Sequence, residues 1–130
     1  MNEVIVGLGS NIDPQKNIKK AREILKGKYS VILESRFIQT KPVGLVNQAD
    51  FINGAILMRT ELELNDLDSQ LKLIEKALGR ETSVQKFGPR TIDLDIIIWN
   101  KEIIDKDFYE REFLKNSVLE LIPNLQIPNK

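Results

Sequence analysis

Two aspartates inside an otherwise apolar run are the residues best suited to chemistry in this chain. Asp93 and Asp95 lie in "FGPRTIDLDIIIW", residues 87–99, a stretch typical of a buried strand. Because alternate residues of a strand share a face, we expect both carboxylates on one side, about 7 Å apart. Oxygen donors at this spacing could share one or two Mg²⁺ ions, which would offset the repulsion between the two charges. The alternative is a strand whose aspartate-bearing face is simply solvated.

Basic residues come just before this strand. Arg80 opens the polar segment, and Lys86 and Arg90 flank "FGP". A guanidinium near two carboxylates could form a structural ion pair, or it could bind a phosphate that the metal ions also bind. Metal ions with Arg and Lys side chains around a polyphosphate are the common arrangement for phosphoryl transfer. The chain has no Walker A sequence, so we do not expect a P-loop enzyme.

Three other features could serve a ligand or be purely structural. "GLGSN", residues 7–11, could bring a ligand close to the backbone or form a tight turn before a helix. Phe51 and Asn53 share one face of a predicted strand, where a ring could stack on a planar ligand and an amide could bind its edge. Phenylalanine is more often a core residue, whereas asparagine is unfavourable in a strand. Glu75 lies beside the apolar face of a predicted helix, where spacing favours a surface residue.

Composition excludes several kinds of site. Lys and Arg together number 19, and so do Asp and Glu together. The net charge is therefore zero, and no overall field favours nucleic acid or an anionic membrane. The chain has no cysteine and no histidine, which leaves oxygen ligands and hard cations such as Mg²⁺. No segment approaches the roughly 20 apolar residues that would span a bilayer. We therefore expect a cytoplasmic protein, organised as one domain over residues 1–130.

The predicted elements alternate between strands and helices. Asp13 suits an N-cap, Pro14 the first helical position, and Gly27 the exit from the first helix. Strands are expected over residues 3–9, 29–40, 50–60 and 91–100, and helices over 10–27, 65–79 and 109–123, with loops at 41–49 and 80–90. This βαββαβ order predicts an α+β, ferredoxin-like fold: an antiparallel sheet covered by helices, followed by a C-terminal helix.

Taken together, these residues resemble the 6-hydroxymethyl-7,8-dihydropterin pyrophosphokinase family of folate biosynthesis. "FGPRTIDLDI" is similar to the family's Gly-Pro-Arg-Thr and Asp-Leu-Asp signature, and "GLGSN", "TKPVG", "DFINGA", "IEKALGR" and "EREF" match at fitting spacings. The resemblance implies transfer of pyrophosphate from ATP to the hydroxymethyl group of the pterin, giving AMP and the pterin diphosphate. ATP and the pterin would be its partners. We expect a monomer rather than an oligomer, and the balanced charge predicts no nucleic-acid or membrane partner.

The resemblance further assigns roles to individual residues. Asp93 and Asp95 correspond to the pair that holds two Mg²⁺ ions, and Arg80 and Arg90 to catalytic-loop arginines. The pterin pocket would comprise Thr40, Pro42, Val43, Phe51, Asn53 and Phe113. The nucleotide site would comprise Glu75, Lys86, Phe87, Arg90, Ile96 and Arg111.

Two other functions remain open. The family usually places a histidine at the ATP, and this chain has none. A degenerate member that binds pterin or nucleotide without catalysis is therefore an alternative. An RNA-recognition domain shares the βαββαβ order, but zero net charge and the lack of an aromatic-rich Arg/Lys-Gly-Phe strand argue against it.

Overall fold

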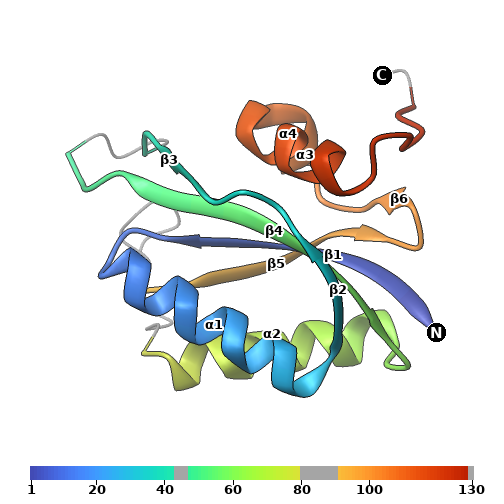
Figure 1. Ribbon diagram of the computed structural model, residues 1–130, viewed down its shortest axis with the longest axis horizontal. Coiled ribbons are helices and arrows are strands. Elements are labelled where there is room, and N and C mark those ends of the chain that lie inside the picture. The colour runs from blue at the N-terminus through green and yellow to red at the C-terminus, as the bar shows by residue number, and fades with distance from the viewer. Residues whose placement is uncertain (43–46, 80–90, 129–130) are drawn as a thin grey trace.

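The computed structural model describes residues 1–42, 47–79 and 91–128 (Figure 1). Val43, Arg80, Lys86, Phe87 and Arg90, which the sequence assigns to the site, lie outside the described residues. The elements in chain order are β1 (Asn2–Ser10), α1 (Pro14–Lys28), β2 (Ser30–Glu34), β3 (Ile38–Thr40), β4 (Phe51–Thr60), α2 (Leu64–Ala77), β5 (Asp93–Trp99), β6 (Glu102–Ile103), α3 (Asp107–Glu110) and α4 (Glu112–Leu121).

The strands form one antiparallel sheet with β1 at its centre. The order is β2-β4-β1-β5-β6, and the short β3 also pairs with β4. Helices α1 and α2 cover one face, while α3 and α4 lie over the other (Figure 1). The predicted mixed α and β architecture with a helix-covered antiparallel sheet is therefore confirmed.

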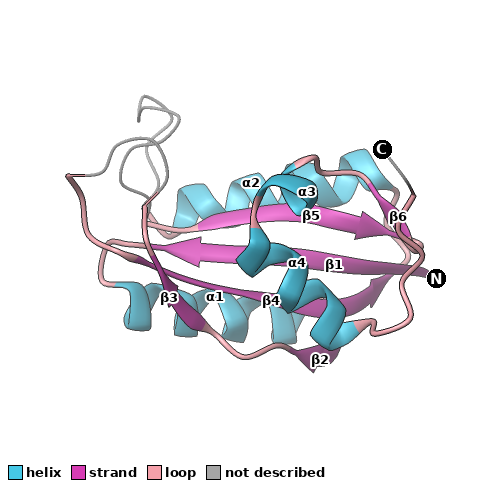
Figure 2. Cartoon of the chain, turned by 90° about the horizontal axis from the view of Figure 1, so that it is seen from above, coloured by secondary structure: helices cyan, strands magenta, loops and turns pink. Residues whose placement is uncertain are grey.

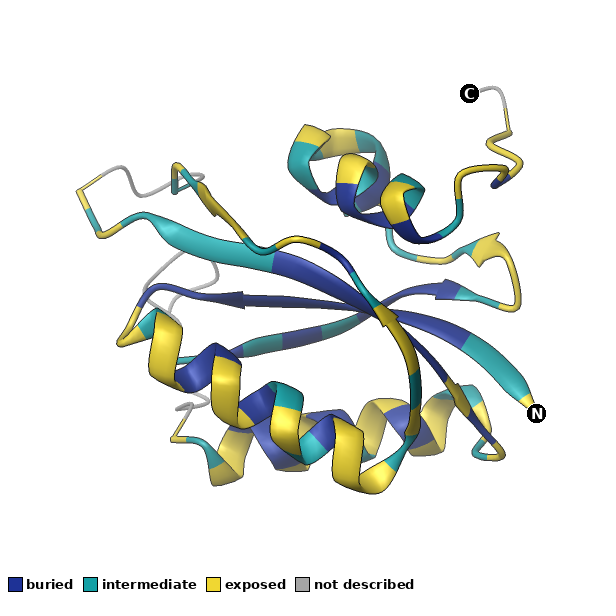
Figure 3. Ribbon diagram, in the orientation of Figure 1, coloured by how far each residue is buried: buried dark blue, intermediate teal, exposed yellow. Residues whose placement is uncertain are grey.

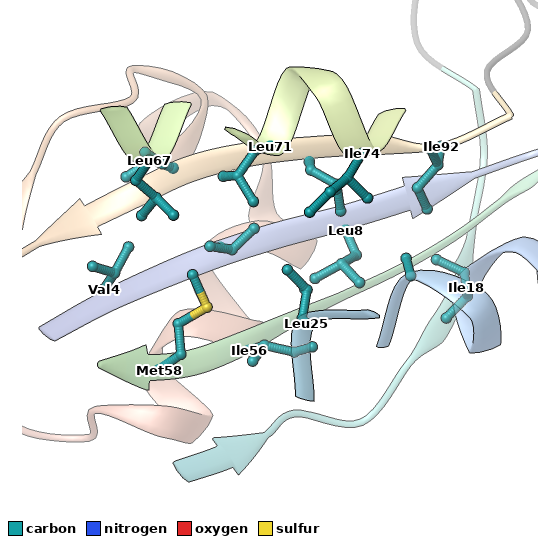
Figure 4. Packing of buried hydrophobic residues seen from close by; sticks show 14 residues of the cluster. Val4, Leu8, Ile18, Leu25, Ile56, Met58, Leu67, Leu71, Ile74 and Ile92 are labelled. Atoms are coloured by element: carbon teal, nitrogen blue, oxygen red, sulfur yellow. The ribbon is translucent and has the colours of Figure 1, made fainter. Parts of the chain in front are cut away.

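Each face of the sheet has its own apolar cluster. The first packs Ile18, Ala21 and Leu25 of α1 and Leu67, Leu71 and Ile74 of α2 against β1, β4 and β5 (Figure 4). The second packs α3, α4 and the segment after α4 against Ile5, Ala55, Leu57, Ile97 and Ile98. Apolar residues three and four apart on α1 and α2 produce these buried stripes, and the outward helix faces stay exposed (Figure 3). Two clusters on opposite faces hold the central strands rigid from both sides.

The single strand predicted over residues 29–40 is wrong. Two strands, β2 and β3, occupy this region, separated by residues 35–37. In the pairing of β2 with β4, Val31 is opposite Met58 but Leu33 is opposite Leu57, so Ile32 is an extra, bulged residue. A bulge reverses the in–out alternation after it, and Leu33 is 50% exposed instead of facing the core.

The first helix differs from its prediction at both ends. Asp13 occupies the N-cap position with φ 42°, but its side chain makes no capping hydrogen bond. Instead, the turn is tied by Asn17 Nδ2 and Ser10 Oγ, which both donate to the carbonyl of Ile12. Gly27 lies inside α1 rather than at its exit, because α1 continues to Lys28. By contrast, the second helix ends close to the predicted residue 79: α2 stops at Ala77, and Gly79 adopts φ 101°, a left-handed geometry common just after helices.

The C-terminal third contains an unpredicted hairpin and a broken helix. Asn100 and Lys101 both have positive φ and join β5 to β6 in a two-residue turn, with Trp99 opposite Glu102. The last predicted helix, residues 109–123, is two helices, because Arg111 leaves helical geometry at φ −118° and ψ 106°. Within the described parts of the chain, no helix is both long and apolar enough to cross a membrane.

Candidate functional site

Helices α3 and α4 lie over part of one face of the sheet and leave the half with the end of β1 and the starts of β4 and β5 uncovered (Figure 2). Gly9 of β1 is paired with Asp93 on β5 and with Asn53 on β4. Two residues earlier, Gly7 is paired with Asp95 on one side and Ala55 on the other. Since residues two apart share a face, Asp93 and Asp95 of β5 lie on one side of the two glycines, and Asn53 and Ala55 of β4 lie on the other. We call this three-strand row the trough, with β5 and β4 as its walls and β1 as its floor.

The floor of this trough requires glycine at position 9. A Cβ atom on Gly9 would lie 2.5 Å from Asn53 Oδ1 and 3.9 Å from the Phe51 ring. The Asn53 amide therefore lies over the backbone of β1, in space that any other residue would occupy. The predicted shared face of Phe51 and Asn53 is confirmed by this contact. The "GLGSN" glycines are thus part of a strand and of a floor beneath both walls.

The two aspartates are less exposed than a pair of freely solvated surface carboxylates. Both side chains are half-buried, and the next residue on their face, Ile97, is buried beneath α4. The predicted common face of Asp93 and Asp95 is confirmed by their pairing with Gly9 and Gly7. Asp95 Oδ1 lies 3.2 Å from Lys72 Nζ of α2. A cation is thus already present beside one carboxylate, and it comes from the helix under the sheet.

Lys72 and Glu75 of α2 bind the backbone of β5 between the two aspartates. The Leu94 N–H donates to Glu75 Oε2 at 2.6 Å, and Lys72 Nζ donates to the Leu94 carbonyl at 3.1 Å. Lys72 Nζ also lies 3.4 Å from Glu75 Oε2. Within the described residues, β6 pairs with this edge of β5 at Ile98 and Trp99, and at Leu94 the Lys72 and Glu75 side chains satisfy the backbone groups instead. They hold the strand at the residue between Asp93 and Asp95.

Glu75 is a buried residue, so the surface position favoured by spacing is wrong. It is 4% exposed, and its carboxylate accepts the Leu94 N–H bond. A buried carboxylate is stable only with such partners. The helical period places Glu75 beside Ile74 but cannot reveal that α2 approaches the edge of β5. That approach is a tertiary contact, and the sequence carries no local signal for it.

Electrostatics around the aspartates favour a cation. Burial lowers the pKa of Lys72, but the charges of Asp95 and Glu75 outweigh it, and the pKa is raised overall. Burial raises the pKa of Asp105, and the charges of Asp107, Asp95 and Glu110 act in the same direction, against the hydrogen bond from the Asp107 N–H. Acidic side chains after β6 therefore add to the field at Asp95. Such a field attracts positive charge to this end of the trough.

The opposite wall contains a hydrogen-bonded amide beside an aromatic ring. Asn53 Nδ2 donates to Thr40 Oγ1 of β3, and Thr40 is paired with Phe51 across the strands. Pro42 lies two residues after the end of β3. Three predicted pterin residues, Thr40, Phe51 and Asn53, therefore lie together where β3 pairs with β4, and Pro42 lies in the segment after β3. An amide fixed by a hydroxyl next to a ring can bind the polar edge of a flat heterocycle.

Other predicted site residues lie at different places. Phe113 is half-buried on α4 and packs against the second cluster, and Arg111 is the half-buried residue between α3 and α4. The Ile96 side chain lies in the first cluster, on the face opposite to the aspartates. Its backbone is therefore the part of Ile96 that could meet a nucleotide.

A buried asparagine next to the trough was not predicted as a contact. Asn11 Nδ2 donates to Gln48 Oε1 at 2.8 Å and to the Ala49 carbonyl at 3.0 Å. This ties the end of β1 to the segment that leads into β4. The signal for it was the polar pair that ends "GLGSN", since a buried polar side chain needs partners.

Comparison with known proteins identifies relatives across nearly the whole chain. The family described as 7,8-dihydro-6-hydroxymethylpterin-pyrophosphokinase matches residues 5–123. The 2-amino-4-hydroxy-6-hydroxymethyldihydropteridine pyrophosphokinase of Bacillus subtilis is 33% identical over 96% of this chain and 81% of its own length. The protein of the same name from Aquifex aeolicus is 34% identical over 98% of this chain and 85% of its own length.

Longer relatives also match. A folate synthesis bifunctional protein of Arabidopsis thaliana is 35% identical over 98% of this chain, but the match covers 28% of that protein. A second, mitochondrial, bifunctional protein from the same plant is matched over 24% of its length. The chain thus spans about a quarter of these two relatives and most of the bacterial ones.

Proposed function

Because this chain belongs to the 7,8-dihydro-6-hydroxymethylpterin-pyrophosphokinase family, we propose that it transfers the terminal diphosphoryl group of ATP to 6-hydroxymethyl-7,8-dihydropterin. The hydroxymethyl oxygen forms a bond to the β-phosphorus as the bond between the α,β-bridging oxygen and that phosphorus breaks, and AMP leaves. The observation that carries the proposal is the cross-strand row Asp93–Gly9–Asn53. It places one carboxylate and one side-chain amide on either side of Gly9, and the amide would bind the heterocycle.

Asp93 and Asp95 are the proposed ligands for Mg²⁺, and we propose two ions. Their fit rests on two half-buried carboxylates on one face, with Lys72 already drawn to Asp95. Carboxylate oxygens are the donors that Mg²⁺ prefers. Bound there, Mg²⁺ would supply neutralisation of phosphate charge, which dominates catalysis of phosphoryl transfer. The hydrogen bond from the Leu94 N–H to Glu75 Oε2 holds β5 between the two carboxylates for that role.

The wall formed by β3 and β4 is the proposed pterin site. Asn53 would bind the donor-rich edge of the pterin, with its amide held by Thr40, and Phe51 would stack against the ring. Pro42 and Phe113 would complete the pocket, as would Val43, which lies outside the described residues. Because Asn53 and Asp93 flank the same glycine, the pterin hydroxymethyl group could point along the row toward the aspartates.

The nucleotide contacts are proposed from family membership. Arg80 and Arg90 would neutralise the triphosphate, and Lys86, Phe87 and Arg111 would contact the nucleotide, together with the backbone of Ile96. Arg111 alone of these five side chains belongs to the described part of the chain. Glu75 retains its predicted place in this site, but its burial favours action through Leu94 over direct contact.

The proposal also covers the fold, the domain organisation, the oligomeric state and the location of the protein. The strand order is compatible with a ferredoxin-like βαββαβ core, to which β3, β6, α3 and α4 are additions. We infer one domain over residues 1–130 that works as a monomer in the cytoplasm. The lack of histidine keeps a non-catalytic binding protein as the second candidate.

Product analysis tests the function directly. The protein is incubated with ATP, Mg²⁺ and the hydroxymethyl pterin, and phosphorus NMR follows the products. AMP and pterin diphosphate in equal amounts are expected. Formation of ADP would indicate transfer of a single phosphoryl group. Pterin binding without AMP would favour the non-catalytic candidate.

A further inference from the structure

We propose that Lys72 is a built-in counter-ion of the aspartate pair, which a divalent cation must displace from Asp95. The inference rests on the proposed metal site. It adds a competitor for that site, supplied by the chain itself. The Lys72 ammonium lies 3.2 Å from Asp95 Oδ1, close enough for a direct ion pair.

The geometry of Lys72 allows displacement without loss of its other contacts. An ammonium group has three donors, and Lys72 Nζ has three acceptors nearby: Asp95 Oδ1, the Leu94 carbonyl and Glu75 Oε2. If Asp95 turned to a metal ion, the Leu94 carbonyl and Glu75 would remain. Lys72 would then stay anchored to the edge of β5 while Asp95 is free to bind the ion.

Exposure makes this contact exchangeable. The side chain of Lys72 is 44% exposed and that of Asp95 is 48% exposed, so water reaches both. An exposed ion pair of this kind is weak and exchanges readily. By contrast, the Glu75 side chain is 5% exposed and stays fixed. The three charged groups therefore differ in role. The Glu75 carboxylate is fixed, the Lys72 ammonium is held by it, and the Asp95 carboxylate can be released.

As a consequence, we expect the protein to bind a divalent metal ion only weakly when no nucleotide is present. A divalent ion at Asp95 loses the attraction it would have for an unpaired carboxylate, and it meets the charge of the nearby ammonium. A metal ion that arrives with a polyphosphate brings negative charge to compensate. The counter-ion would thus favour loading of the metal together with its nucleotide.

The test measures Mn²⁺ binding without nucleotide, by electron paramagnetic resonance of the free ion. Lys72→Met removes the charge at similar length, and Lys72→Arg retains it. Lys76→Met is the matched control, because Lys76 is exposed one turn along the same helix. We expect Lys72→Met to bind Mn²⁺ about three- to tenfold more tightly than wild type, with Lys72→Arg and Lys76→Met near wild type.

Thermal unfolding gives a second readout that does not depend on turnover. At a fixed Mn²⁺ concentration, a ligand that binds the native state more tightly raises Tm more, so Mn²⁺ should raise the Tm of Lys72→Met more than that of wild type. The counter-ion role of Lys72 would be overturned if Lys72→Met and wild type bound Mn²⁺ equally tightly, or if Lys72→Met showed no detectable Mn²⁺ binding. An equal gain in Lys76→Met would also overturn it, because the effect would then be one of net charge.

Asp95→Asn separates this inference from the proposed function. If Asp95→Asn abolishes AMP formation but Lys72→Met gains no Mn²⁺ affinity, the metal site stands and the counter-ion is overturned. If Asp95→Asn keeps both Mn²⁺ binding and AMP formation, the metal site itself is wrong, and the counter-ion fails with it.

Discussion

Replacement of Glu75 tests whether α2 positions the aspartates through the backbone of β5. Glu75→Leu removes the carboxylate that accepts the buried Leu94 N–H at 2.6 Å and leaves that donor without its partner. A hydrogen bond to a charged group contributes about 1.5–3 kcal/mol, so we expect a loss of about 2 kcal/mol in the free energy of unfolding. Glu75→Gln keeps the volume and one acceptor oxygen, and we expect a loss of about 1 kcal/mol.

Urea unfolding followed by the fluorescence of Trp99 measures this loss. Trp99 is the single tryptophan of the chain and ends β5, the strand that Glu75 holds. Glu63→Gln is the control, because Glu63 is exposed at the N-cap of α2 and makes no side-chain capping bond. We expect its unfolding free energy to fall by no more than about 0.5 kcal/mol, from the loss of a negative charge at the N-terminus of the helix.

Steady-state kinetics distinguish positioning from direct nucleotide contact. If Glu75 acts through Leu94, Glu75→Gln shifts both carboxylates and lowers kcat together with stability. If Glu75 instead touches the nucleotide, KM for ATP rises while the unfolding free energy stays at the wild-type value. The second outcome would refute the positioning role.

Three further changes follow from the geometry and the proposal. Gly9→Ala places a Cβ 2.5 Å from Asn53 Oδ1, so KM for the pterin should rise with little change in KM for ATP; Gly27→Ala, with open space around it, is the control that should leave both unchanged. The pKa of Glu34 is lowered, chiefly by the hydrogen bond from Arg22. A carboxyl group whose pKa is lowered by folding stabilises the protein at pH values above its ordinary pKa. That stabilisation is lost as the pH falls through the pKa of the folded state. Glu34→Gln should therefore be less stable than wild type by about 1 kcal/mol near pH 7, and urea unfolding should show that difference vanish in acid; a constant difference at all pH values would contradict the ion pair. Arg90→Ala should lower kcat more than pterin affinity, and a loss of pterin binding with full turnover at saturation would count against its role at the phosphates.

Local periodicity accounts for what could be predicted about the site. The shared face of Asp93 and Asp95 follows from the two-residue repeat of a strand, as does that of Phe51 and Asn53. The end of α2 follows from Gly79, because glycine adopts the left-handed geometry at a helix end more readily than any other residue type. These features depend on neighbours in sequence, so the sequence contains their signal.

Tertiary contacts account for what could not be predicted. Lys72 reaches Asp95 because α2 packs beneath the edge of β5, at a separation of 23 residues. The exposure of Leu33 depends on a bulge that appears only when β2 pairs with β4. The row from Asp93 through Gly9 to Asn53 depends on the register of three strands. Strand periodicity restricts which face each residue takes, but it does not specify which residues of distant strands become partners.

The most direct measurement of the central claim is AMP formation by Asp93→Asn and Asp95→Asn at saturating ATP, Mg²⁺ and pterin. Each variant should lose at least about a hundredfold in kcat while Tm stays close to that of wild type. Asp13→Asn is the matched control, because Asp13 is exposed with φ 42°, which asparagine also tolerates, and its turnover should be unchanged. Near-normal AMP formation by either variant would contradict the assignment of these carboxylates to the reaction.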